Sequence, residues 1–175
     1  MQLPHGYTIE PATPAHVPLL AAIEIAAAGI FPPCSLPEHM RSDSVPESVL
    51  LEAVRQGLLW VALAGDGRPV GHALVQLVED VALLAQIDVH PEHMRKGIGS
   101  ALILHIVEHL RLRKKAALYL TTFRHIPWNE PFYAKLGFAA LDKNKEPAFL
   151  NNILEEEKLS GLQNRIAMQL MIQQR

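Results

Sequence analysis

Apolar and polar positions alternate along the chain in two different periods, which predicts a fold that mixes strands with helices. Helical spacing of apolar residues, together with helix start and stop signals, predicts helices over residues 14–27, 46–56, 97–114, 128–136 and 148–158. Short apolar runs bounded by turn residues predict strands over residues 7–10, 58–64, 69–78, 81–89, 116–122, 138–141 and 165–172. Antiparallel strands followed by alternating strands and helices indicate a mixed α/β sheet with helices on its faces.

A strand, a glycine-containing loop and a helix follow one another near the middle of the chain. The strand over 81–89 is almost wholly apolar, which predicts burial on both of its faces. In the loop, Gly97 and Gly99 leave room for a polyanion near the main chain, and Arg95 and Lys96 add positive charge. The first amides of the helix point toward the same place, where the helix dipole puts about half a positive charge. The sequence therefore predicts a binding site for a phosphorylated ligand.

The segment 31–46 is expected to be mostly loop, because it contains four prolines. Loops of this length often carry function. Together with the tail over 143–164, this segment is expected to shape a ligand pocket. The acidic residues in and beside these two segments favour a cationic amine over a large protein surface as the ligand; they are Glu38, Asp43, Glu47, Glu155, Glu156 and Glu157.

Composition narrows the classes of partner and compartment. With 175 residues, 49% of them hydrophobic and 19% charged, the chain is typical of one globular domain. A net charge of -2 argues against a large basic surface for DNA or RNA. No run approaches the roughly 20 apolar residues that a membrane span needs, and the first residues do not resemble a secretion signal. A single cysteine, Cys34, fits a reducing compartment, so we expect a cytoplasmic protein without membrane or nucleic-acid partners.

Two motifs in the second half of the chain resemble a known superfamily. Residues 94–99 read MRKGIG, and residues 127–138, about thirty positions further on, read PWNEPFYAKLGF. They are similar to the loop Gln/Arg-x-x-Gly-x-Gly/Ala and the segment Asn...(Phe/Tyr)-Tyr-x-x-Leu-Gly-Phe of the GNAT (GCN5-related) N-acetyltransferase superfamily. The two motifs occur in the right order, and the order of elements from residue 6 to 172 also fits.

The resemblance implies a fold, a reaction and a set of site residues. The fold would be that of an acyl-CoA N-acyltransferase, with a largely antiparallel twisted sheet, a splayed central strand pair and flanking helices, in one domain over 1–175. Acetyl-CoA would be the co-substrate, without a metal, and its acetyl group would pass directly to a primary amine, expected to belong to a small molecule. The residues implied to bind the cofactor are Ile87, Val89, Met94, Arg95, Lys96, Gly97, Ile98, Gly99, Ser100 and Asn129.

Each of these residues would have a distinct task. The backbone of Ile87 and Val89 would pair with the pantetheine arm, and the amides of residues 95–100 would hold the pyrophosphate. Tyr133 would protonate the departing thiolate, as a phenol with a reference pKa of about 10 is able to do. Two structural alternatives stay open, namely that Tyr133 is only a packed aromatic residue and that Asn129 is a helix N-cap.

Two positions depart from the family pattern. Met94 stands where glutamine or arginine is usual, and Ala85 stands where similar sequences often carry a glutamate as general base. An amine with a lysine-like pKa of about 10.4 costs roughly 4 to 5 kcal/mol to deprotonate at pH 7, so another group must help. In order of preference, the candidates are a water relayed to Glu79 or Asp80, and then a direct base such as His125 or Glu130.

Other functions remain as alternatives. Ala85 and Met94 would also suit a catalytically silent module that binds or senses acyl-CoA. Residues 105–109 read HIVEH and match the H-x-x-E-H pattern of a zinc hydrolase, although the same helix already serves the glycine loop. The oligomeric state stays open, with a homodimer as one option, because a late strand in such folds can pair between subunits.

Overall fold

The computed structural model describes residues 3–173. The strands are β1 (Tyr7–Pro11), β2 (Leu59–Ala64), β3 (Pro69–Val78), β4 (Val81–Val89), β5 (Ala117–Phe123), β6 (Ala139–Ala140) and β7 (Arg165–Met171). The α-helices are α1 (Val17–Ala28), α2 (Glu47–Gln56), α3 (Ile98–Leu112), α4 (Asn129–Lys135) and α5 (Ala148–Leu159). Short 3₁₀ helices occupy Glu38–Arg41, Pro91–His93 and Lys143–Lys145. The predicted order of strands and helices is thus confirmed.

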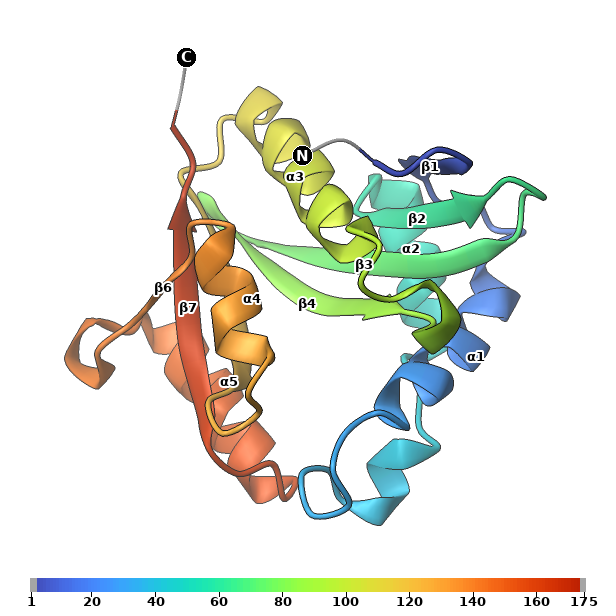
Figure 1. Cartoon of the computed structure of the whole chain (residues 1–175). Coiled ribbons are helices and arrows are strands. Elements are labelled where there is room, and N and C mark those ends of the chain that lie inside the picture. The colour runs from blue at the N-terminus through green and yellow to red at the C-terminus, as the bar shows by residue number, and fades with distance from the viewer. Residues whose placement is uncertain (1–2, 174–175) are drawn as a thin grey trace.

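The strands form one mixed sheet in the order β1-β2-β3-β4-β5-β7-β6. Every neighbouring pair is antiparallel except β4 and β5, which run parallel. That parallel pair joins at only two positions, Ala82 with Leu118 and Leu83 with Tyr119. Beyond them the two strands diverge, and Figure 1 shows the opening between β4 and the β5–β7 half of the sheet. The implied splayed central pair is therefore confirmed.

The helix α3 anchors the core beneath the first half of the sheet. Its apolar stripe, Ile98, Leu102, Ile106 and Leu110, is at most 1% exposed, as the helical spacing predicts. Burying each such side chain contributes about 1.5 to 3 kcal/mol relative to leaving it in water. Helices α1 and α2 lie across the sheet from α3 (Figure 1), so both faces of β3 are covered.

The strand β4 departs from its prediction in its second half. Residues 82–84 are buried, but residues 85–89 are partly exposed, because β5 no longer covers that edge. The register also slips by one residue: Leu74 lies opposite Gln86 and Val75 opposite Leu84, which leaves Ala85 as the extra residue of a β-bulge. A bulge bends its strand and changes which side chains face each side. Burial on both faces was therefore a wrong prediction for 85–89.

Smaller differences concern the ends of elements. The first helix begins at Val17 rather than at residue 14, because residues 14–16 form a turn. The strand expected over 138–141 shortens to two residues. The proline-rich segment 31–46 is a loop with a single 3₁₀ turn, as expected. Within residues 3–173, no helix has the length and apolar content that crossing a membrane requires.

Candidate active site

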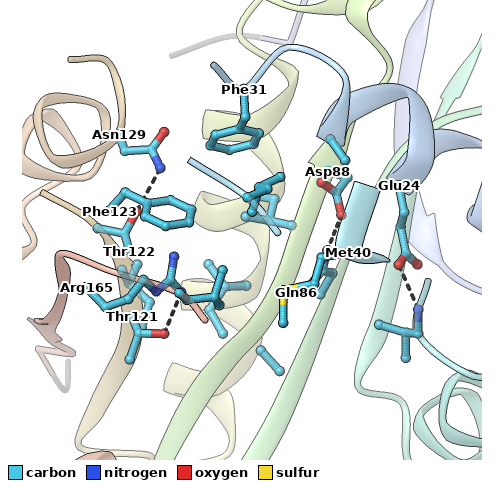
Figure 2. Close-up of a pocket in the computed structure, with 18 of the residues that line it drawn as sticks. Glu24, Phe31, Met40, Gln86, Asp88, Thr121, Thr122, Phe123, Asn129 and Arg165 are labelled. Atoms are coloured by element: carbon cyan, nitrogen blue, oxygen red, sulfur yellow. Dashed lines mark hydrogen bonds between the residues drawn. The ribbon is translucent and has the colours of Figure 1, made fainter. Parts of the chain in front are cut away.

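A cavity of about 400 Å³ opens where β4 and β5 separate (Figure 2). Its walls come from residues 84–88 of β4, residues 120–123 of β5, the α4 side chains of Asn129 and Tyr133, Leu162 and Arg165. Glu24 and Ala28 of α1 also line it, together with residues of the proline-rich loop such as Phe31, Met40 and Asp43. The tail packs against this loop at Gly161, where an added Cβ atom would lie 3.0 Å from Pro37 Cγ. The proline-rich loop and, through Leu162, the tail both line this cavity.

The glycine loop presents a row of free backbone amides at the start of α3. Arg95 and Gly97 both have positive φ, +58° and +83°, and this alternation turns successive N–H groups toward one concave surface. The first helical hydrogen bond runs from the Ala101 N–H to the Gly97 carbonyl. No acceptor within residues 3–173 takes the N–H groups of residues 95–100. Such a nest at a helix N-terminus is suited to an anion.

The remaining loop residues have mixed roles. Ile98 and Ser100 are buried. Gly99 serves packing as well, because a Cβ there would lie 3.4 Å from Phe132 Cζ and 3.9 Å from Val89 Cγ2. Met94 is partly buried and contributes no polar side-chain atom.

The basic side chains of the loop stay close to it. Arg95 and Lys96 are exposed. The Lys96 Nζ donates to the Tyr7 hydroxyl at 3.3 Å, and this hydroxyl lies 2.9 Å from His93 Nδ1. Burial, together with the nearby Lys96 charge, lowers the pKa of His93. The positive charges of Arg95 and Lys96 favour bound negative charge at the nest.

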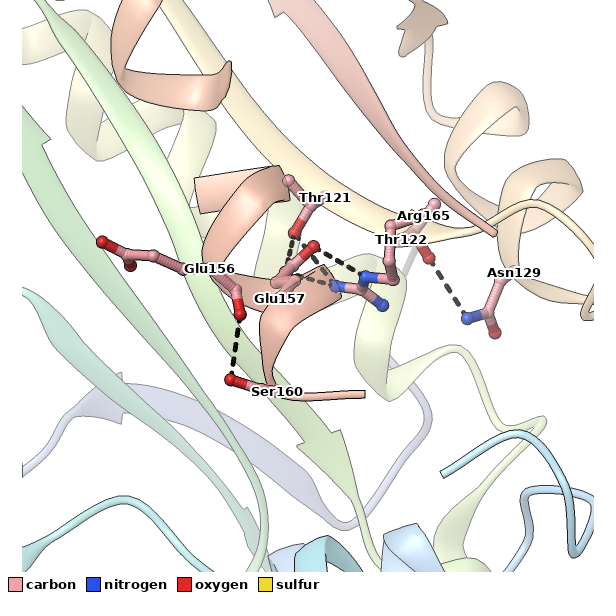
Figure 3. A network of polar contacts seen from close by, with 7 residues as sticks. All are labelled: Thr121, Thr122, Asn129, Glu156, Glu157, Ser160 and Arg165. Carbon is pink, nitrogen blue, oxygen red and sulfur yellow. Dashed lines mark hydrogen bonds and ion pairs between the residues drawn. The ribbon is translucent and has the colours of Figure 1, made fainter. Parts of the chain in front are cut away.

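The helix α4 brings two of the predicted site residues to the cavity. Burial raises the pKa of Tyr133 to about 12, and its ring packs edge-to-face with Phe132 and Phe138. Within residues 3–173, the Tyr133 hydroxyl has no hydrogen-bond partner. Asn129 is not the N-cap of α4, a position that Trp128 holds. Its Nδ2 instead donates to Thr122 Oγ1 at 3.1 Å and ties α4 to β5 (Figure 3).

None of the four residues considered as general base lines the cavity. Glu79 and Asp80 form the turn before β4, and five residue steps along the strand, about 17 Å, lead from Asp80 to the bulge at Ala85. The His125 ring packs against the ring of Phe123, and His125 does not line the cavity. Glu130 Oε2 lies 4.0 Å from Arg124 Nε.

Three carboxylates do line the cavity, and sequence reasoning assigned no role to two of them, Glu24 and Asp88. Asp88 accepts a hydrogen bond of 2.5 Å from Gln86 Nε2 (Figure 2). It pairs across the sheet with His72, which is fully buried. Burial raises the pKa of Asp88 to about 6, the Glu24 charge adds to the rise, and His72 and Gln86 oppose it.

Glu24 and His72 form a buried pair behind Asp88. The His72 Nε2 lies 3.3 Å from Glu24 Oε1, and the other carboxylate oxygen of Glu24 accepts the Val45 N–H at 2.8 Å. Glu24 is 5% exposed. The two polar positions of β4, Gln86 and Asp88, alternate in an otherwise apolar strand, and this was the one available signal for the cluster.

The opposite wall carries an ion pair that joins three elements (Figure 3). Arg165 of β7 donates from Nε and Nη2 to both carboxylate oxygens of Glu157 in α5, at 2.9 and 2.8 Å. Thr121 of β5 accepts from Arg165 Nη2 at 2.9 Å and donates to Glu157 at 2.6 Å. The guanidinium also lies 4.4 Å from the centre of the Phe123 ring. The network fixes the wall that β5 and β7 form.

The H-x-x-E-H pattern over 105–109 does not gather into a metal site. His109 packs edge-to-face against the buried Trp60, at 4.9 Å between ring centres, and Glu108 pairs with Arg111. Within residues 3–173, no group of three His, Cys, Asp or Glu residues is placed to hold a metal ion.

Comparison with known proteins agrees with this geometry. The family described as "Acetyltransferase (GNAT) family" matches residues 26–138. A [Ribosomal protein bS18]-alanine N-acetyltransferase from Escherichia coli K12 is 31% identical over 113 residues, which are 62% of this chain and 76% of that protein.

Two solved structures share the whole fold. The crystal structure of the ribosomal-protein-S18-alanine N-acetyltransferase from Escherichia coli superposes with a TM-score of 0.68 and 25% identity, over 97% of this chain and 96% of its own. PaiA N-acetyltransferase from Thermoplasma acidophilum, solved in complex with coenzyme A, superposes with a TM-score of 0.72 and 18% identity, over 94% of this chain and 98% of its own. The opened sheet, the amide nest and these matches lead to one conclusion: the chain belongs to the acetyltransferase (GNAT) family and is an N-acetyltransferase, with acetyl-CoA as its acetyl donor.

Proposed function

We propose that the chain transfers the acetyl group of acetyl-CoA directly to a primary amine held in the cavity between β4 and β5. The observation that carries the proposal is the nest of six free amides, residues 95–100, at the end of the opened strand. If the diphosphate of acetyl-CoA binds at the nest, the rest of the cofactor can extend along β4 toward the cavity. The thioester and the amine would then meet between the two strands.

The open edge of β4 suits the pantetheine arm. One edge of this strand is paired with β3 along its length, whereas the other is paired with β5 only at Ala82 and Leu83. The backbone of Ile87 and Val89 therefore lies on a strand with a free edge, where an extended ligand with amide groups can add like a further strand. Arg95 and Lys96 supply charge near the phosphates, and the amides of the nest stand in for the polar side chain that Met94 lacks.

Tyr133 is the proposed proton donor to sulfur. The neutral amine attacks the thioester carbonyl carbon, the carbon–sulfur bond breaks, and the departing sulfur takes the phenolic proton. The proton that the new amide nitrogen sheds returns to the phenolate through solvent. Because the pKa of Tyr133 is about 12, the phenol is fully protonated at neutral pH, and its free hydroxyl has a proton to give.

The acceptor is proposed to be a primary amine of limited size. A volume of about 400 Å³ is at the small end for ligand pockets, and three carboxylates in the lining favour a cation. The relatives named above act on an alanine of a ribosomal protein. A free small amine and the amino end of a peptide both fit these conditions, so both belong in the test.

An acetyl-transfer screen tests the proposal. Purified protein is incubated with radiolabelled acetyl-CoA and free amino acids, polyamines, aminoglycosides, a peptide that begins with alanine, and the same peptide with a blocked amino end and one lysine. Transfer to at least one amine is expected. Calorimetry with coenzyme A accompanies the screen, and failure to bind at millimolar concentration would refute the cofactor assignment.

A further inference from the structure

We propose that Asp88 is the group that takes the proton from the acceptor's ammonium ion, and that Gln86 positions its carboxylate for this step. The inference rests on the proposed function and names a residue for the one task that Ala85 leaves unfilled. Neither Asp88 nor Gln86 entered the sequence prediction of the site.

The bulge at Ala85 places both side chains on the cavity wall. After the extra residue, Gln86 and Asp88 fall on the same side of β4, two positions apart, and both line the cavity (Figure 2). The hydrogen bond between them directs Gln86 Nε2 to Asp88 Oδ2, so the other carboxylate oxygen, Oδ1, is the one left for a ligand. No residue in 3–173 forms a hydrogen bond with that oxygen.

The other cavity carboxylates are less suited to the task. Glu24 is only 5% exposed; its Oε2 accepts the Val45 N–H, and its Oε1 lies 3.3 Å from His72 Nε2. Asp43 lies in the exposed loop and accepts only the N–H of its neighbour Ser44. Asp88 is partly exposed at the cavity and partly buried against the polar pair behind it.

The charged and titratable groups around Asp88 come from four elements. His72 of β3 lies opposite it in the sheet, and Glu24 of α1 lies next to His72. Tyr133 of α4 is close enough for the Asp88 charge to raise its pKa, and Arg165 of β7 lowers the pKa of the same phenol. An ammonium ion beside Asp88 would therefore lie within reach of both the proposed base and the proposed acid.

The protons balance over the reaction. The acceptor enters as an ammonium ion, and one N–H bond breaks as its proton moves to Asp88. The neutral nitrogen then forms the new bond to the acetyl carbon while the carbon–sulfur bond breaks and sulfur receives the Tyr133 proton. The nitrogen loses its second proton to the phenolate through solvent, and Asp88 releases the first to solvent.

The proposal favours one class of amine. With a pKa of about 6, Asp88 accepts a proton from an α-ammonium ion of pKa about 8 with an unfavourable ratio of about 10². From a lysine ammonium of pKa about 10.4 the ratio exceeds 10⁴. The α-amino group of a small molecule or a peptide is thus the expected acceptor.

The test is the pH dependence of kcat/KM for the best acceptor of the screen, from pH 5 to 9. For the wild type, kcat/KM should rise with pH through about 6, as Asp88 loses its proton. Asp88→Asn should lose this limb, fall by about 10² to 10³ at pH 7 and recover toward the pKa of the amine, because the amine then arrives neutral. Asp142→Asn, at an exposed aspartate beside Lys145, is the matched control and should keep the wild-type profile.

A second variant tests the role of Gln86. Its hydrogen bond lowers the pKa of Asp88, so Gln86→Leu should move the acid limb upward by about 1 pH unit, since a hydrogen bond to a charged group is worth roughly that much. A variant that merely loosened the structure would lower the rate without moving the limb. Coenzyme A binding is measured in every variant to show that the fold is intact.

The outcomes separate this inference from the proposed function. A wild type that binds coenzyme A but acetylates no amine overturns both. An active wild type whose profile is unchanged in Asp88→Asn overturns the inference alone. Should Asp88→Asn fail to fold, Gln86→Leu decides: an upward shift supports the assignment, and an unmoved limb overturns it.

Discussion

Replacing Asp88 with asparagine should stabilise the protein at neutral pH even though it is expected to impair catalysis. The pKa of this carboxyl rises from its ordinary 3.8 to about 6, chiefly because burial disfavours its charged form. Between these two values, the folded chain holds a proton that the unfolded chain has already lost. Stability therefore falls as the pH rises from about 4 to 6, and the full cost is present at pH 7.

The size of this cost follows from the two pKa values. A rise from 3.8 to about 6 is roughly 2.2 pKa units, and at 1.36 kcal/mol per unit this amounts to about 3 kcal/mol. Asp88 is partly exposed, so solvent screening reduces the gain expected from asparagine to about 2 kcal/mol. For a chain of 175 residues this corresponds to a rise in Tm of about 4 to 8 °C.

Urea unfolding of the wild type and Asp88→Asn at several pH values measures the effect. Urea is preferred to guanidinium chloride because it is uncharged and leaves the electrostatic interactions unscreened. The variant should be more stable by about 2 kcal/mol at pH 7, and the difference should vanish below pH 4, where the carboxyl is protonated in both states. A difference that is absent at pH 7, or equally large at pH 4, would refute the reasoning.

Three further outcomes are expected. Tyr133→Phe should lower kcat by about 10² to 10⁴ with coenzyme A affinity unchanged by calorimetry, and a loss below threefold would remove it from the role of acid. Gly97→Val should raise the Kd for coenzyme A more than tenfold, because φ at this position is +83° in the middle of the nest, whereas Gly67→Val, at a similar φ of +80° in a hairpin turn, should leave the Kd unchanged. Glu157→Gln should lower the free energy of unfolding in urea by about 2 to 4 kcal/mol, since Arg165 loses its carboxylate partner; equal stability would contradict the importance of that pair.

The features that local sequence determines were predicted well. The stripe of α3 and the turn residues between strands depend on neighbours within a few positions, so periodicity reveals them. Gly137, with φ of +94°, ends α4 where the sequence predicted the helix to stop. The amide nest likewise depends on a short segment, and its glycines were visible in the sequence.

The polar cluster behind the cavity depends on long-range pairing and was therefore missed. Glu24, His72 and Asp88 come from three elements, and only the register of β3 with β4 brings the last two together. The bulge at Ala85 sets that register, and no residue pattern around Ala85 indicates that the strand contains an extra residue. Glu79 and Asp80 were expected to act from a distance through a water, but they lie at the start of β4, and the strand carries them away from the opening.

The two-position join between β4 and β5 has a mechanical consequence. β4 pairs with β3 at eight positions, and β5 pairs with β7 at seven. The sheet therefore consists of two well-paired halves that are joined at only two positions. Under our proposal, a donor molecule would lie between these two halves and would bridge them for as long as it stays bound. If the proposal holds, the two halves should separate most easily in the interval between release of one coenzyme A and binding of the next.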